Sequence, residues 1–264
     1  MAQRQIVVYP NPEILAEATA ARTLLTIVDA LAEPGRTRFD IALTGGTDGN
    51  RLLAAIKASP LVEAVDWSRV HFWWGDERFV AADDPDRNAG QAREALLDWL
   101  VADYALPEAN IHEMPADTRP ASAVAAASPE ETDAVLAEAA ADYQRELTEQ
   151  LGEGNGLDLV QFGMGPDSHF ASLFPGLPQV RLDDPHVLVA GVRDSPKPPP
   201  LRLTFTVPMI TRSTRTWMIT SEERKAQALA NALAEPRNPE APSSYADAAD
   251  ELLWLVDKGA ASLL

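Results

Sequence analysis

Asp167 and His169 lie two residues apart in a glycine-rich stretch, Gly163–His169, that directly follows an apolar run. Histidine is the side chain best suited to proton transfer near neutral pH, and a neighbouring carboxylate can orient its ring. The pair therefore indicates general acid–base chemistry, although a single histidine in a sequence is more often structural. We expect this stretch to form a turn that opens a helix. The other histidines lie in no comparable loop and are given no chemical role: His71, His112 and His186.

A second glycine turn follows the short apolar run Ile41–Leu43 and contains Gly45, Gly46 and Thr47. Where a strand turns into a helix, successive backbone N–H groups and the helix dipole can face an anion. Glycine at a strand end more often serves the turn geometry alone. The turn is thus a candidate anion site that needs support from other residues.

A charged turn follows the large apolar residues Val70–Trp74 and includes Asp76, Glu77 and Arg78. A solvated surface turn is the ordinary interpretation of such a cluster. The functional interpretation is that its arginine faces a ligand.

Lys197 lies among the prolines of the stretch Asp194–Pro200. Prolines stiffen the backbone and so limit how far this lysine can move. A polyproline ligand for a partner domain is the alternative, but a strand pattern, Arg202–Thr206, follows at once.

The composition narrows the kinds of ligand and compartment. The 264 residues carry 22 basic and 40 acidic side chains, a net charge of −18, which disfavours nucleic acid and anionic membranes as partners. An anionic ligand must therefore be bound by a local cluster of cations and N–H groups. The absence of cysteine excludes disulfides, thiolate nucleophiles and cysteine-ligated zinc. Residues Met1–Val8 lack the features of a signal peptide, and no apolar run approaches about 20 residues, so we expect a cytoplasmic protein.

Strand and helix patterns alternate along the chain. Strands are expected at Ile6–Tyr9, Ile41–Leu43, Val70–Trp74, Leu157–Phe162, Val187–Ala190, Arg202–Thr206, Thr216–Thr220 and Leu252–Val256. Helices are expected after Asn11–Glu13, at Arg51–Ile56, at about Asn88–Leu100, from Ser128 to Gly152 and at Ser221–Leu233. The apolar face expected for the first helix comprises Ile14, Leu15, Ala18, Leu25, Val28 and Leu31. This order predicts one α/β domain over residues 1–264, a three-layer sandwich with a mostly parallel open sheet and helices on both faces. In such sheets ligands bind beyond the carboxyl ends of the strands, where the glycine-rich and charged loops would converge.

Several of these segments, taken in order, resemble the 6-phosphogluconolactonase family. The matching segments are Trp74–Arg78, Asp83–Asp86, Asn88, Gly163–Asp167, His169, Ala171–Gly176 and Ser195–Pro199. The resemblance spans nearly the whole chain and implies a fold like that of glucosamine-6-phosphate isomerase, of Rossmann-like type. It also implies hydrolysis of 6-phosphoglucono-1,5-lactone to 6-phosphogluconate, the second step of the oxidative pentose phosphate pathway, without metal or other cofactor.

The resemblance also assigns roles to individual residues. His169 would be the general base that activates water, and Asp167 would support it. Arg78 and Lys197 would bind the substrate phosphate. Backbone N–H groups of the turn Gly45–Thr47 would add to that phosphate site. Asp76 would bind sugar hydroxyls or hold the arginine, and either the Gly45 or the Gly165 turn could supply the oxyanion donors. The expected partner is a small phosphorylated sugar lactone, and we expect a monomer.

Three residues depart from the common family pattern. Asp48 follows the glycine turn, where its carboxylate would disfavour phosphate unless it points away or caps the helix. Ser168 replaces a glycine before the histidine, so we expect the backbone there to avoid the left-handed region. Phe170 stands where a threonine is common.

Three alternatives remain open from the sequence. Glucosamine-6-phosphate deaminase shares the fold, but its Asn-Glu-Pro segment after the histidine is absent here. Sugar-phosphate sensing domains of transcription regulators carry an added helix-turn-helix, whereas this sequence starts directly with a strand pattern and is acidic. A sugar-phosphate-binding protein without catalytic activity is the third alternative, and it rests on Ser168 and Phe170.

Overall fold

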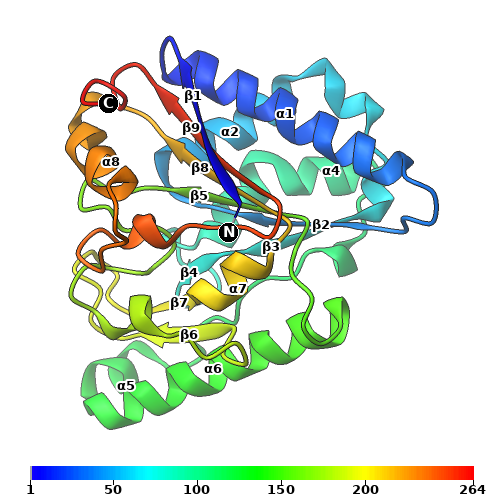
Figure 1. Ribbon diagram of the computed structural model, residues 1–264. Coiled ribbons are helices and arrows are strands. Elements are labelled where there is room, and N and C mark those ends of the chain that lie inside the picture. Colours follow the sequence, from blue (N-terminus) through cyan, green and yellow to red (C-terminus); the bar gives the residue numbers. More distant parts are fainter. Residues whose placement is uncertain (1) are drawn as a thin grey trace.

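Six parallel strands form the main sheet in the computed structural model of the chain, which describes residues 2–264 (Figure 1). Their order across the sheet is β1-β9-β8-β5-β2-β3. The strands are β1 (Gln3–Tyr9), β9 (Glu251–Asp257), β8 (Arg215–Thr220), β5 (Leu159–Gly163), β2 (Phe39–Leu43) and β3 (Val70–Trp74). Each coincides with an expected strand to within three residues at either end. The predicted mostly parallel α/β sheet is therefore confirmed.

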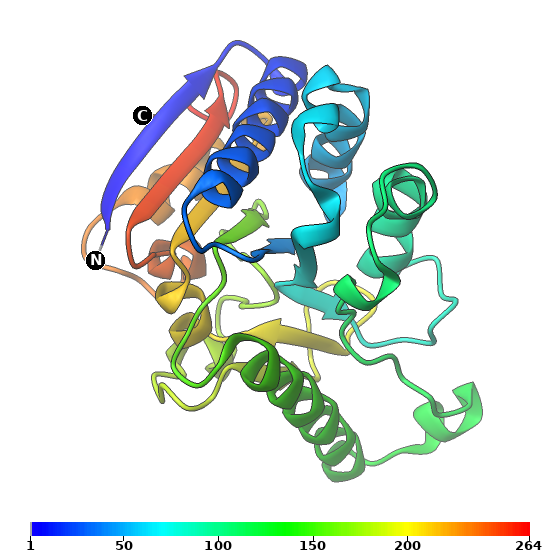
Figure 2. The ribbon, with the colours of Figure 1, turned by 90° about the vertical axis from the view of Figure 1, so that its right-hand side faces the viewer.

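A small antiparallel sheet, which the sequence analysis did not foresee, lies beside the main one. It consists of β4 (Asp76–Arg78), β7 (Arg202–Phe205) and β6 (Val189–Val192), in the order β4-β7-β6. Both ribbon views place this sheet between the main sheet and helix α6 (Pro129–Leu151) (Figures 1 and 2). The two strands expected around 187–206 therefore exist but do not join the parallel sheet. No helix lies between these two strands in the sequence. A parallel pairing would need such a crossover, so the two strands pair antiparallel, as in a hairpin.

Helices lie on both sides of the main sheet, and one of them, α6, packs on the small sheet (Figure 1). They are α1 (Pro12–Ala32), α2 (Gly46–Ala58), α3 (Asn88–Ala92), α4 (Asp98–Asp103), α5 (Ala121–Ala126), α6 (Pro129–Leu151), α7 (Val207–Arg212) and α8 (Ala226–Leu233). A π-helical turn, Arg93–Leu97, joins α3 to α4, so the helix expected at 88–100 is present with one irregular turn. Helices α1 and α8 lie on opposite sides of β9 (Figures 1 and 2).

The ends of the two longest helices follow from local sequence. The Asn11 side chain accepts a hydrogen bond from the Ile14 N–H at 2.9 Å, which caps α1. At α6, Ser128 and Glu131 form a reciprocal capping box, as predicted. Gly152 ends that helix with φ +85°, a conformation that glycine adopts at little cost.

The predicted apolar face of α1 is partly wrong. Leu15 and Leu31 are buried as expected, but Ile14 and Leu25 are 40% and 48% exposed. Threonine and alanine side chains occupy much of the buried stripe instead. Thr19, for example, is buried because its hydroxyl donates a hydrogen bond to the Leu15 carbonyl at 2.7 Å, within the same helix. A prediction from large apolar residues alone does not identify buried threonines whose hydroxyl groups are hydrogen-bonded within the helix.

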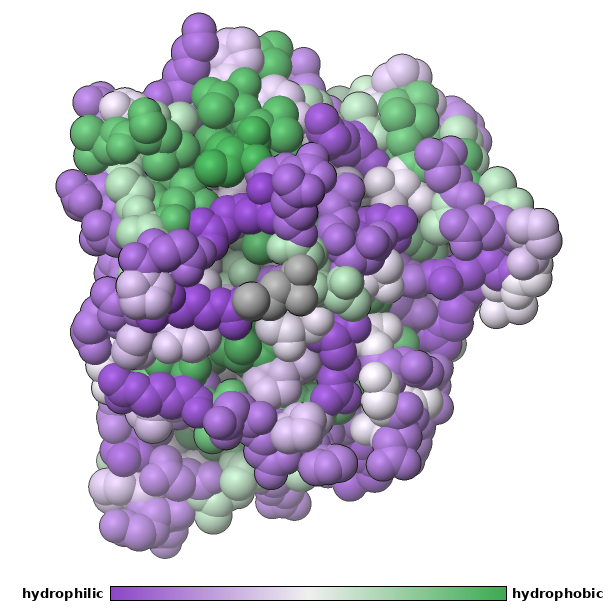
Figure 3. Space-filling view, in the orientation of Figure 1, coloured by the Kyte–Doolittle hydropathy of each residue, from purple (hydrophilic) through white to green (hydrophobic). Residues whose placement is uncertain are grey.

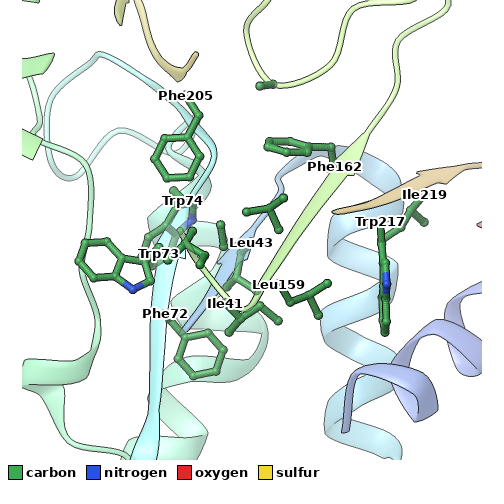
Figure 4. Close-up of a cluster of buried hydrophobic side chains, with 14 of the residues drawn as sticks. Ile41, Leu43, Phe72, Trp73, Trp74, Leu159, Phe162, Phe205, Trp217 and Ile219 are labelled. Carbon is green, nitrogen blue, oxygen red and sulfur yellow. The ribbon is translucent and has the colours of Figure 1, made fainter. Parts of the chain in front are cut away.

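The core fills both faces of the main sheet around its central strands. Figure 4 shows side chains of β2, β3, β5 and β8, with Trp73 and Trp74 among the largest buried residues. Phe205 of the small sheet lies near Trp74, and its N–H donates to the Gly75 carbonyl at 2.7 Å. The two sheets therefore share one core, and the strands of the main sheet read as nearly unbroken apolar runs.

Strand β1 forms an edge of the main sheet. Figure 3 shows apolar surface at the upper left, over β1 and the C-terminal turn. Ile6, Val8, Leu263 and Leu264 are the large apolar residues exposed in these segments. Within residues 2–264, no helix has the length and apolar character needed to cross a membrane. The monomeric state and the single domain over residues 1–264 stay predictions.

Two histidines form a partly buried polar chain beside β3. His71 Nδ1 lies 3.0 Å from His112 Nε2, and His112 Nδ1 lies 2.6 Å from Glu146 Oε1. The His112 ring stacks on Trp73 at a centroid distance of 3.9 Å. Burial, with help from the Arg38 guanidinium and His112, lowers the pKa of His71 to about 4, although Asp40 opposes this shift. Both histidines therefore serve structure, in keeping with the absence of a chemical role in the sequence analysis.

The low pKa of His71 predicts a loss of stability on mild acidification. In the unfolded chain this group titrates near its ordinary value of 6.5, so between pH 6.5 and about 4 the unfolded state binds the extra proton. Stability is fully present above pH 6.5 and falls as pH drops towards 4. His71→Asn keeps a polar group that can hydrogen-bond to His112 but does not titrate in this range. Thermal unfolding from pH 7.5 to 4.5 should therefore show a smaller fall in Tm for this variant than for the unmodified chain, and equal falls would contradict the assignment.

Candidate active site

A cavity of about 370 Å³ lies at the carboxyl ends of β2, β3 and β5. Seven of the eight residues predicted for the site line it: Gly45, Gly46, Thr47, Asp76, Arg78, His169 and Lys197. The eighth, Asp167, lies behind His169 and is hydrogen-bonded to it. Four segments far apart in sequence thus meet at this cavity, and three of them follow neighbouring parallel strands, as expected.

His169 is held through one ring nitrogen. Its Nδ1 lies 2.5 Å from Asp167 Oδ1, and its ring stacks on Phe174 at a centroid distance of 4.6 Å. Among the described residues, Nε2 has no hydrogen-bond partner, and the ring lines the cavity. A carboxylate on Nδ1 favours the tautomer whose Nε2 carries a lone pair. The geometry therefore offers a proton acceptor towards the cavity.

Lys197 contacts this same pair. Its Nζ lies 3.0 Å from Asp167 Oδ1 and 3.0 Å from His169 Nδ1. Burial alone would raise the pKa of Asp167, but the hydrogen bonds and charges of His169 and Lys197 outweigh it and hold that pKa well below its usual range. Asp167 is therefore ionised at neutral pH and can act only as an acceptor.

The turn that presents His169 differs from the prediction in two ways. No helix follows it; residues 170–174 form turns and isolated bridges, because Met164 and Leu173 both pair with Phe170. Ser168 has φ +63°, so the backbone does enter the left-handed region. Its Oγ donates to the Ala228 carbonyl at 2.9 Å, and its own carbonyl accepts from the Ser243 N–H at 2.9 Å. These tertiary bonds offset the strain of a non-glycine residue at positive φ.

Two neighbours of the turn are constrained by packing. A Cβ on Gly165 would lie 2.0 Å from the His169 ring, so only glycine permits this fold of the loop. Phe170 is fully buried and meets Phe162 edge to face at 5.5 Å. A phenylalanine at this position therefore belongs to the core and does not enter the cavity.

The glycine turn begins α2. Gly45 is the N-cap residue, Gly46 has φ +76°, and the helix continues for 13 residues. A Cβ on Gly45 would lie 1.9 Å from Asn88 Oδ1, so this position admits only glycine. The first turn of α2 lines the cavity with N–H groups that the helix itself does not use.

Asp48 does not leave an unpaired carboxylate in this turn. It is buried, and it accepts hydrogen bonds from Ser221 Oγ at 2.5 Å and from Lys225 Nζ at 2.8 Å. The ion pair with Lys225 neutralises its charge. The departure from the family pattern is thus compensated by Ser221 and Lys225, which lie between β8 and α8, although Asp48 itself lines the cavity.

Arg78 and Asp76 come from β4, and a buried carboxylate holds that strand in place. Glu77 is fully buried and accepts from the N–H groups of Arg78, Asn88 and Ala89 at 2.7, 2.7 and 2.8 Å. Burial raises the pKa of Glu77, against the opposing effect of Arg87 and these hydrogen bonds. The carboxylate thereby caps α3 and fixes the backbone of Arg78.

Asp76 is held away from Arg78. Its Oδ2 accepts from Ser172 Oγ at 2.7 Å, and among residues 2–264 no hydrogen bond joins the two side chains. Arg78 donates instead to the Asp86 carbonyl. Asp76 therefore does not hold Arg78 through a hydrogen bond, and its role towards sugar hydroxyls stays a prediction.

Sequence reasoning did not identify several side chains that build the site around the cavity. They are Glu77, Asn88, Ser172, Arg202 and Lys225. One signal was available for two of them. Glu77 and Arg202 are charged residues at the ends of apolar strand patterns, where a buried charge must find partners. Ser172 and Lys225 carry no such signal, because only the tertiary fold brings them to Asp76 and Asp48.

The arrangement supports hydrolysis assisted by a base. A histidine with a free Nε2 faces a cavity that also holds Arg78, Lys197 and a helix N-terminus, which together suit an anionic substrate. In the part of the chain that the structure describes, no three acidic or histidine side chains are grouped so that they could hold a metal ion.

Comparison with known proteins finds relatives over nearly the whole chain. A family model described as glucosamine-6-phosphate isomerases/6-phosphogluconolactonase matches residues 10–254. A 6-phosphogluconolactonase of Streptomyces coelicolor is 42% identical over 98% of this chain and 94% of its own length. One from Mycobacterium tuberculosis is 37% identical over 98% of both chains.

Solved structures of 6-phosphogluconolactonases have a similar fold. The structure of 6-phosphogluconolactonase from Trypanosoma cruzi superimposes with a TM-score of 0.80, at 23% identity, over 100% of this chain and 98% of that one. At that identity the likeness concerns the fold. Together with the match over residues 10–254, these findings show that the chain belongs to the glucosamine-6-phosphate isomerase/6-phosphogluconolactonase family.

Proposed function

We propose that this enzyme hydrolyses 6-phosphoglucono-1,5-lactone to 6-phosphogluconate, the second step of the oxidative pentose phosphate pathway. The observation that carries the proposal is the Asp167–His169 pair, 2.5 Å apart, at the wall of a cavity that also contains Arg78 and the start of α2. The relatives named 6-phosphogluconolactonase, up to 42% identical over nearly the full chain, support the same substrate.

His169 acts as the general base. Its Nε2 takes a proton from water as the water oxygen attacks the lactone carbonyl carbon, forming a tetrahedral intermediate. The bond between that carbon and the ring oxygen then breaks, and the imidazolium returns the proton to the departing ring oxygen. Asp167 accepts the Nδ1 proton throughout, which fixes the tautomer and stabilises the imidazolium. Water and lactone are consumed, and the acid that forms ionises to 6-phosphogluconate.

The substrate phosphate binds where positive charge gathers. Arg78, Lys197 and the N–H groups of Gly45–Thr47 line this part of the cavity, although the whole chain carries a net charge of −18. Asp76 accepts hydrogen bonds from sugar hydroxyls. Lys197 Nζ also lies 3.0 Å from Asp167 Oδ1 and 3.0 Å from His169 Nδ1, so this ammonium is next to the base.

Other properties of the enzyme belong to the same proposal. The reaction requires neither metal nor organic cofactor, the chain acts as a monomer in the cytoplasm, and residues 1–264 form one domain. The N–H groups of the Gly45 and Gly165 turns are the two candidate donors to the oxyanion.

The direct test is hydrolysis of freshly made 6-phosphogluconolactone, coupled to 6-phosphogluconate dehydrogenase and compared with the spontaneous rate. We expect acceleration that excess chelator does not remove. Glucosamine 6-phosphate, offered in a parallel assay for released ammonia, should not react. Ammonia release without lactone hydrolysis would favour the deaminase alternative, and a folded protein without either activity would favour a binding protein.

Removal of the base should reduce turnover much more than affinity. His169→Gln keeps a polar side chain of similar length but cannot accept the proton, so kcat should fall about 10²–10⁴-fold with little change in KM. His186→Gln, an exposed histidine outside the cavity, is the matched control and should keep full activity. Full activity of the His169 variant would rule out this histidine as the base.

Removal of Arg78 should have the opposite effect on the two constants. Arg78→Ala loses a charge-assisted contact with phosphate worth about 1.5–3 kcal/mol, so KM should rise roughly tenfold to a hundredfold with a small change in kcat. Steady-state kinetics with the lactone, and inhibition by inorganic phosphate, measure the effect. An unchanged inhibition constant for phosphate would show that the anion binds elsewhere.

A further inference from the structure

Arg202 is a buried arginine at the cavity for which the proposed reaction has no role so far. It begins β7, is only 5% exposed, and lines the cavity beside Lys197 and Pro198. A charge buried this deeply is costly unless its donors are satisfied by specific partners. Its partners therefore indicate what it does.

Those partners are three consecutive carbonyl groups of one loop. Arg202 Nε donates to the Pro199 carbonyl at 2.7 Å, and Nη2 donates to the carbonyls of Pro198 and Lys197 at 3.1 and 3.2 Å. Two of these three residues are prolines, which have no N–H group with which to form ladder hydrogen bonds of their own. The planar guanidinium thus supplies the contacts that a regular strand would have made.

Among residues 2–264, Ser195 is the other side chain that hydrogen-bonds the backbone of this loop. Ser195 Oγ donates to the Lys197 carbonyl at 2.9 Å, and the Ser195 N–H donates to the Pro200 carbonyl at 3.0 Å. Arg202 holds the segment between these two points, directly where the side chain of Lys197 departs. That side chain ends 3.0 Å from both Asp167 and His169.

The position of Arg202 also has an electrostatic cost. In the antiparallel pairing of β4 with β7, Arg202 lies directly opposite Arg78, and like charges in such a pair repel. Burial and the neighbouring Arg78 charge lower the pKa of Arg202, while Asp76 and Glu77 oppose them. A neutral residue would avoid this repulsion, but it could not bind three carbonyls.

We infer that Arg202 is a positioning residue for the proposed reaction: by binding the carbonyls of residues 197–199 it holds the Lys197 ammonium against the Asp167–His169 pair. The inference rests on the proposed lactonase activity. Arg202 acts through Lys197, and its importance for catalysis therefore disappears when Lys197 can no longer make its contacts.

A double-mutant cycle tests this dependence. Arg202→Lys keeps the charge but replaces the fork with a single nitrogen, and we expect kcat/KM for the lactone to fall about tenfold in the otherwise unmodified enzyme. In a Lys197→Met background the same change should cost less than about twofold. Arg212→Lys is the matched control, because Arg212 also donates to a backbone carbonyl, of Pro185, but lies outside the cavity. It should leave kcat/KM unchanged in both backgrounds.

Equal losses in the two backgrounds would overturn the inference, since Arg202 would then act independently of Lys197. So would a fully active Arg202→Lys enzyme. The Tm of each variant is measured as well. A general loss of folding would lower Tm and would lower kcat/KM by the same factor in both backgrounds, whereas loss of positioning alone leaves Tm unchanged. If the unmodified enzyme does not accelerate lactone hydrolysis, the proposed function is wrong. If the enzyme is active but the two substitutions lower kcat/KM independently, only the inference about Arg202 is wrong.

Discussion

The parallel pairing of six strands determines where the polar side chains of this protein can act. Because both faces of the central strands are covered, β2, β3 and β5 are largely apolar. Polar residues accumulate in the segments that follow these three strands. Parallel strands place these segments at one edge, where the loop between β6 and β7 adds Lys197 to the same cavity. The parallel pairing of the strands therefore determines which side chains can meet in the site.

Within that cavity, buried charges are arranged in compensated groups. Asp48 is neutralised by Lys225, and Glu77 is satisfied by three backbone N–H groups. Such groups leave Arg78, Lys197 and the start of α2 to attract an anion, although the surface as a whole carries an excess of acid. Local geometry thus outweighs net charge in the choice of ligand.

Much of this could be predicted from the sequence. Apolar runs, caps and glycine turns located the strands of the main sheet and most helices, and seven of eight expected site residues line the cavity. The misses have physical reasons. Ser168 adopts positive φ because bonds to Ala228 and to Ser243 offset the strain, and neither partner is near it in sequence. The pairing of β4 with β7 in the small antiparallel sheet likewise joins segments that are far apart in the sequence.

The place of β1 in the sheet has a consequence for synthesis of the chain. Among the residues that the structure describes, this strand pairs with β9 alone, so that Gln3 meets Glu251 and Tyr9 meets Asp257. Strand β1 therefore leaves the ribosome long before its partner. Its unpaired backbone is open to aggregation during that time, and Ile6 and Val8 remain exposed even after β1 has paired with β9. Closure of the sheet by β1 and β9 is consequently a late event on the ribosome, and it comes after the strands around the cavity have all emerged.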